Sequence, residues 1–135
     1  MRRCRLVLIL GTAATLAMLS CVTDPVERTY PLAADSITAP DTVAVTDPLV
    51  VQIHYTLPNG CHSLHRVNCS DVPDGVVCRL IGRKVNMMCD QMVRYRTWEI
   101  TRSVLVPGTF TVEVDQPTGP HLVKEVVIIR DKGDG

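Results

Sequence analysis

The sequence predicts an all-β domain, an antiparallel β-sandwich of about seven strands. Apolar residues alternate with polar ones at a period of two in the clearest segments, and no segment shows the apolar stripe of an amphipathic helix. Turn signals built from Pro, Gly, Asn and Asp recur roughly every eight to twelve residues, which is typical of sandwiches of short strands. Aromatic residues make up only 4% of the chain and Val is abundant, which favours a core of β-branched side chains.

The chain begins with a segment that resembles a bacterial lipoprotein export signal. Met1-Arg2-Arg3-Cys4-Arg5 is cationic, and the apolar run over residues 6–19 is shorter than the ~20 residues of an ordinary membrane span. Met18-Leu19-Ser20-Cys21 then resembles a lipobox, although Met18 stands where Leu is usual. The resemblance implies cleavage before Cys21 and attachment of lipid to that cysteine.

The export signal predicts where the protein works. Residues 1–20 would be the signal peptide, and residues 21–35 a lipidated Cys21 with a flexible tether that reaches roughly 50 Å. We expect a cell-envelope protein, held to a membrane by this lipid and facing the periplasm or the exterior. An ordinary secretory signal and an uncleaved anchor helix remain as alternatives. In a further alternative, residues 30–32 fold back onto the edge of the domain instead of forming part of the tether.

Residues 36–130 form the predicted sandwich domain. The alternating segment 49–57 ends at Pro58-Asn59-Gly60, and a second alternating segment, 109–115, follows Pro107-Gly108. Residues 123–129 are almost continuously apolar, which predicts a strand covered on both faces. The shorter candidate strands are residues 36–39, 42–45, 62–68, 76–85 and 95–106. These strands favour an immunoglobulin-like sandwich, with a small closed barrel as the alternative and residues 131–135 as a disordered tail.

Six cysteines are present, and the export signal accounts for two of them. Cys4 leaves with the signal peptide and Cys21 accepts the lipid. The four that remain are Cys61, Cys69, Cys78 and Cys89. An exported location permits disulfides, and a small β-domain gains about 2–4 kcal/mol from each one. A metal site of these thiols is disfavoured because the spacing contains no Cys-x-x-Cys pair.

A hairpin signal selects among the three ways to pair these four cysteines. Val72-Pro73-Asp74-Gly75 has Pro to initiate the turn and Gly75 for a left-handed bulge position. Folding about this turn brings Cys69 opposite Cys78. We therefore expect a Cys69–Cys78 disulfide, which leaves Cys61 to pair with Cys89.

The arrangement resembles small bacterial lipoproteins of unknown function with an immunoglobulin-like fold. The matching pieces are Asn59-Gly60-Cys61, Cys89 and the late Pro107-Gly108-Thr109-Phe110-Thr111-Val112 strand, within about residues 36–130. The Cys69/Cys78 pair is not part of that pattern. The resemblance implies no catalytic residues.

Charge and motifs argue against several classes of protein. Removal of the three Arg of the leader leaves 11 basic and 14 acidic residues, a net charge of −3, which argues against nucleic-acid binding. The sequence contains no nucleophile elbow, phosphate-binding loop or His-Glu-x-x-His helix. We expect a protein that is not an enzyme and has no cofactor.

A copper-type metal site is the alternative function. His62 and His65 follow Cys61, and three methionines surround Cys89, so a Cys61–Cys89 bridge would bring imidazole and thioether ligands together. The candidate ligands are His62, His65, Met87, Met88 and Met92. Against this site, residues three apart on a strand point to opposite faces, and buried Met is a common gap filler.

The candidate partner-binding residues lie on one predicted strand. Arg94, Arg96, Trp98 and Arg102 fall on one face of it, together with Ile100. Arg and Trp are typical anchors of interfaces, so this face is a candidate surface for an envelope protein or a glycan. In the alternative interpretation, Trp98 and Ile100 belong to the core and the Arg side chains extend along its edge.

Overall fold

A computed structural model of the chain describes residues 25–103 and 105–131. The predicted signal peptide (residues 1–20), Cys21 and residues 132–135 of the predicted tail lie outside the described residues. Nine strands form within the described part, and no helix there is long and apolar enough to cross a membrane. The strands are β1 (Glu27–Leu32), β2 (Ser36–Thr38), β3 (Thr42–Ala44), β4 (Leu49–Leu57), β5 (His62–Val72), β6 (Gly75–Val85), β7 (Arg94–Arg102), β8 (Gly108–Asp115) and β9 (Leu122–Ile129).

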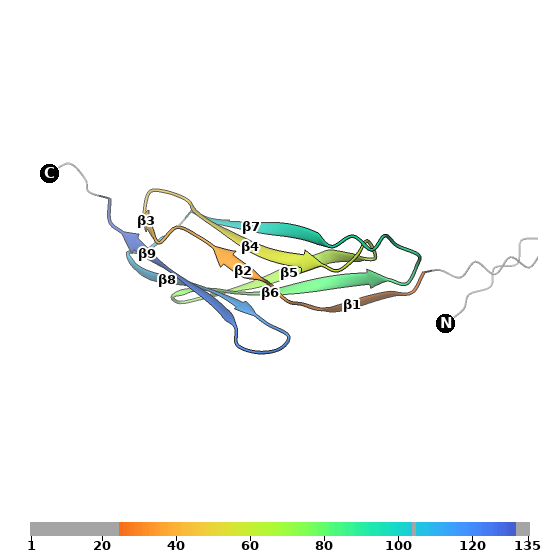
Figure 1. Cartoon of the computed structure of the whole chain (residues 1–135). Coiled ribbons are helices and arrows are strands. Elements are labelled where there is room, and N and C mark those ends of the chain that lie inside the picture. The colour runs from red at the N-terminus through yellow and green to blue at the C-terminus, as the bar shows by residue number, and fades with distance from the viewer. Residues whose placement is uncertain (1–24, 104, 132–135) are drawn as a thin grey trace, which may run out of the picture.

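The strands form two sheets that pack face to face, which confirms the predicted β-sandwich (Figure 1). The larger sheet has six strands in the order β1-β6-β8-β9-β3, and β5 pairs along the other side of β6. One side of β6 is shared, because β8 pairs with residues 75–79 and β1 with residues 80–85. The smaller sheet has the order β2-β4-β7. Both β5 and β7 are therefore edge strands.

Two strand pairs differ from the predicted antiparallel arrangement. β6 runs parallel to β8, and β3 runs parallel to β9. Parallel neighbours need a crossover connection, and β7 in the smaller sheet supplies part of the crossover between β6 and β8. Local periodicity predicts a strand but does not reveal which distant strand lies beside it, so the sequence alone missed these two pairs.

The core lies between the sheets, and β4 illustrates how the sequence builds it. Every second residue from Leu49 to Leu57 is buried, because side chains alternate between the two faces of a strand. The larger sheet contributes its own inward residues from β6, β8 and β9. The fully buried side chains are Leu49, Val51, Ile53, Val76, Cys78, Leu80, Val112, Val114 and Val126.

The folded domain begins earlier than the sequence predicted. Residues 27–32 form β1 and pair with β6, so the prediction of a flexible tether over residues 21–35 is wrong for this part. Leu32 and Ala34 are each 6% exposed, and the ring of Tyr30 packs over Gly82, where a Cβ would overlap it. The alternative that residues 30–32 fold onto the domain edge is confirmed. A period-two pattern was hidden here by Pro31 and by the polar residues on the solvent face.

β9 and Gly75 also depart from expectation. β9 is covered on one face only: Val126 and Ile128 are buried, whereas Val123 and Val127 are 58% and 48% exposed. Gly75 does not have a positive φ; among the described residues the positive-φ glycines are Gly108 and Gly119. Gly75 is required for a different reason, because a Cβ there would overlap the backbone of Thr111 on β8.

Candidate functional site

The first disulfide joins two strands of the six-stranded sheet. Cys69 of β5 lies directly opposite Cys78 of β6, with a Cα–Cα distance of 4.1 Å, and the two form the predicted bridge. Cys78 has no exposed surface, and Cys69 packs against the same core. The bridge is therefore part of the core between the sheets.

The second disulfide ties a loop to the opposite end of the hairpin. Cys61, just before β5, is bonded to Cys89 in the loop between β6 and β7, with a Cα–Cα distance of 5.4 Å. The amide of Gly60 donates to the carbonyl of Asp90 at 3.0 Å, which reinforces the link. Both disulfides predicted from the sequence are therefore present. The Cys61–Cys89 bridge holds the loop formed by residues 86–93. We call this segment the Met loop.

The residues predicted to bind a partner line the inner side of β7. We call Arg94, Arg96, Trp98, Ile100 and Arg102 the arginine face; its residues pair with the inward residues of β4. Arg94 contacts Asp90 at 2.7 Å, and Arg102 contacts Asp71 of β5 at 3.0 Å. The Arg102 pair connects the two edge strands across the open side of the sandwich.

The arginine face also explains why β7 remains an edge. Trp98 and Ile100 pack against the core, as in the alternative interpretation of this strand. Charged side chains that point inward on an edge strand hinder pairing with a further strand. Arg94 and Arg102 thus protect the edge, while Arg96 is exposed. These contacts leave Arg96 as the most accessible residue of the predicted site.

Two of the five candidate copper ligands lie on β5, and the other three lie in the Met loop. His62 Nδ1 lies 2.7 Å from the hydroxyl of Tyr30, and burial, together with the nearby charge of Lys84, lowers the pKa of His62. His65 occupies the bulge of β5 between residues 64 and 66 and is exposed. The three methionines are also exposed: Met87 by 60%, Met88 by 100% and Met92 by 68%. They are therefore not core gap fillers.

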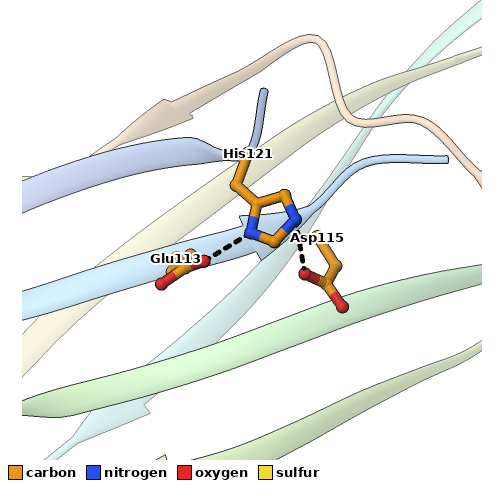
Figure 2. Close-up of side chains that lie close together, drawn as sticks. All are labelled: Glu113, Asp115 and His121. Carbon is orange, nitrogen blue, oxygen red and sulfur yellow. Dashed lines mark hydrogen bonds and ion pairs between the residues drawn. The ribbon is translucent and has the colours of Figure 1, made fainter. Parts of the chain in front are cut away.

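A cluster on the outer surface of the larger sheet was missed by the sequence reasoning (Figure 2). His121, which precedes β9, reaches Glu113 through Nδ1 and approaches Asp115 at 3.1 Å through Nε2. Arg79 of β6 bonds the other oxygen of Asp115 at 2.5 Å. Within the described residues this is the one group of three His, Cys, Asp or Glu side chains spaced for a metal ion.

Neighbouring charges and hydrogen bonds shift the pKa values of two members of this cluster. The hydrogen bond to Glu113 and the charges of both carboxylates raise the pKa of His121. The hydrogen bond from Arg79 lowers the pKa of Asp115. The two carboxylates therefore face the guanidinium of Arg79 and an imidazole whose protonated form they stabilise. The period of two places Glu113 and Asp115 on one face, and Pro117 and Gly119 are turn signals for the hairpin that brings His121 to them.

The outer face of the smaller sheet carries a row of polar side chains. His54 contacts the hydroxyl of Thr38 through Nε2 and that of Thr97 through Nδ1, each at 2.9 Å. Beside this row lies an open hollow of about 580 Å³, which Tyr95 and Arg96 help to line. Tyr95 is 78% exposed. Sequence reasoning selected the inner face of β7 and overlooked this outer one.

The fold and its bridges define a disulfide-stapled β-sandwich without a buried polar centre among the described residues. Residues 51–123, more than half of the chain, match the family model of the ORF11 beta-sandwich domain. The chain therefore belongs to this family. No curated protein and no solved structure matches the chain.

Proposed function

We propose that the chain is a membrane-anchored lipoprotein of the bacterial cell envelope, and a non-catalytic binding or structural module for a protein or glycan. The observation that carries this proposal is the pair of disulfides. They join the four cysteines that remain once Cys4 and Cys21 are assigned to the export signal. Stable disulfides belong to oxidising compartments, which agrees with export.

We further infer that the sandwich is of the immunoglobulin-like type. Its size, its two packed sheets of short strands and its resemblance to small envelope lipoproteins support this assignment. Such domains present binding surfaces on their strand faces and end loops.

The outer face of the smaller sheet supports the glycan side of the proposal. An exposed Tyr ring provides a flat apolar surface, and neighbouring hydroxyl, imidazole and guanidinium groups supply hydrogen bonds that fix orientation. Tyr95, Thr97 and Arg96 line the same hollow. Arg96 is the member of the arginine face that lines this hollow, whereas Arg94 is paired with Asp90.

Mass spectrometry of the mature N-terminus tests the anchor. We expect a chain that starts at Cys21 and carries diacylglycerol and an acyl group. Cys21→Ser should abolish the modification and release the protein from the membrane fraction. An intact leader, or cleavage at another position, would refute the lipoprotein assignment.

Binding to envelope glycans tests the module. The acylated full chain in nanodiscs should bind peptidoglycan or surface-polysaccharide fragments, and Tyr95→Ser should weaken binding by about tenfold, which corresponds to ~1.4 kcal/mol. Val127→Ser is a matched control, because Val127 is also exposed but lies on the other sheet. Equal binding by both variants would exclude this face as the glycan site.

A further inference from the structure

The Met loop exposes an unusual amount of apolar surface. Met88 is fully exposed, and Met87, Met92 and Val93 are 60%, 68% and 51% exposed. Val26, at the start of the described chain, is 55% exposed. Soluble domains seldom expose adjacent apolar side chains in this number without a partner.

The Met loop is held beside the point where the chain enters the domain. The amide of Asn86 donates to the carbonyl of Val26 at 3.1 Å, and the Cys61–Cys89 bridge fixes the loop from the other side. Figure 1 shows the loop between β6 and β7 at the same end of the sandwich as the start of β1. The apolar tips and the N-terminal entry point therefore share one end.

Cationic side chains accompany the apolar ones. Arg28 and Lys84 are paired neighbours on β1 and β6, and with Val26 and Asn86 they line a hollow of about 290 Å³. Two nearby acids are neutralised by partners, since Glu27 contacts Arg83 and Asp90 contacts Arg94. Apolar tips flanked by cations that form no salt bridge with any described residue complement a surface of anionic lipid headgroups.

The chain length between anchor and domain restricts where this end can lie. Cys21 precedes Pro25 by only four residues, which span at most about 14 Å when fully extended. Because β1 begins at Glu27, no long tether separates the two. A lipid on Cys21 would hold this end of the sandwich at the headgroup layer.

We propose that the Met loop, with Val26, Arg28 and Lys84, is a membrane-contact surface that docks the sandwich end-on against anionic lipid. This inference rests on the proposed lipid anchor. Met87, Met88 and Met92 enter the boundary between headgroups and acyl chains, while Arg28 and Lys84 contact lipid phosphates. The opposite end then points away from the membrane, and the outer sheet faces stay accessible from the side.

Methyl NMR of the acylated protein in nanodiscs of phosphatidylglycerol and phosphatidylcholine tests this surface. The mature chain contains only three methionines, so ¹³C-methyl labelling of Met gives three assignable signals, and the Val methyl groups are labelled alongside as the reference. A soluble paramagnetic agent should broaden the methyl signal of Met88 less than that of Val106, although Val106 is only 77% exposed and Met88 is 100% exposed. A spin label on the lipid headgroup should give the reverse order.

Charge reversal at Lys84 tests whether the cations contribute to docking. Lys84→Glu should raise the accessibility of the Met88 methyl group to the soluble agent several-fold, whereas Arg130→Glu, an equal change on an exposed residue after β9, should not. If the soluble agent broadens the Met88 methyl signal at least as much as that of Val106, as their exposed fractions predict for a free surface, the docking surface is refuted. If Cys21 nevertheless carries lipid in that preparation, the anchor stands and only the docking fails; an unmodified Cys21 overturns both.

Discussion

The two ends of the sandwich use the same covalent bond for different purposes. At the hairpin end, around the turn at residues 72–75, the Cys69–Cys78 bridge is buried and joins strands that already pair. At the loop end, formed by residues 58–61 and the Met loop, the Cys61–Cys89 bridge holds a segment with exposed apolar side chains. One bridge adds to the core, while the other orders a loop that buries little.

This difference indicates how a small domain divides stability and function between its ends. The hairpin end tolerates little change in side-chain size, because its core side chains and its backbone are closely packed. The loop end gains its order from a bond that does not require burial, so its apolar side chains stay available.

The largest effect is expected from Gly75→Ala. The added Cβ would overlap the carbonyl of Thr111 across the parallel β6–β8 pair, so the strands must separate. We expect a loss of more than about 4 kcal/mol in the free energy of unfolding, measured by chemical denaturation. Gly119→Ala is the control: its Cβ meets open space and only its positive φ is strained, which costs about 1 kcal/mol. Equal losses would show that the hairpin end is not tightly packed.

Removal of the hairpin-end bridge should have the next largest effect. Cys69→Ala/Cys78→Ala should cost about 3–4 kcal/mol, because ring closure is lost and a cavity forms where Cys78 is fully buried. Ring size alone predicts the opposite order, since the other bridge spans 28 residues and this one spans 9. A smaller loss than in Cys61→Ala/Cys89→Ala would mean that ring closure, not burial, decides the energetics.

Removal of the loop-end bridge should have a more local effect. Cys61→Ala/Cys89→Ala should cost about 2–3 kcal/mol in unfolding free energy. Hydrogen exchange should accelerate at the amides of Gly60 and Asn86, which donate to the carbonyls of Asp90 and Val26. The amides of β4 should accelerate only as much as the loss in global unfolding free energy predicts. Uniform acceleration across the sandwich would contradict a local role.

The smallest effect concerns two histidines in different settings. NMR titration should place the pKa of His62, at the loop end, below the ordinary 6.5, because burial and Lys84 oppose its charge. The pKa of His121 should lie above 6.5, mainly through its hydrogen bond to Glu113. Glu113→Gln should lower the pKa of His121 and leave that of His62 unchanged.

These shifts have opposite consequences for stability. The contribution of His62 is present above pH 6.5 and is lost as the pH falls through its lowered folded-state pKa. The contribution of His121 is complete below pH 6.5 and is lost as the pH rises through its raised folded-state pKa. His62→Gln should remove the first dependence and His121→Gln the second, as measured by denaturation at several pH values. A single histidine responsible for both would refute this assignment.

Much of the fold was predictable because its signals are local. The alternation over residues 49–57 coincides with β4, and the Pro73-Asp74 turn correctly brought Cys69 opposite Cys78. β1 was missed because Pro31 and polar neighbours concealed its single buried face. Within the candidate site, the alternation on β7 correctly grouped the arginine face, but it could not tell that this face points inward.

By itself, the sequence determined the strand-rich class, the principal strands and the pairing of the four cysteines, because alternation and turn chemistry act over a few residues. Only the tertiary structure decided that β6 lies parallel to β8 and that the Met loop lies beside Val26. Each of these contacts joins segments that lie apart along the chain. Their neighbours are chosen by how the two sheets bury their common core, and no local pattern contains that information.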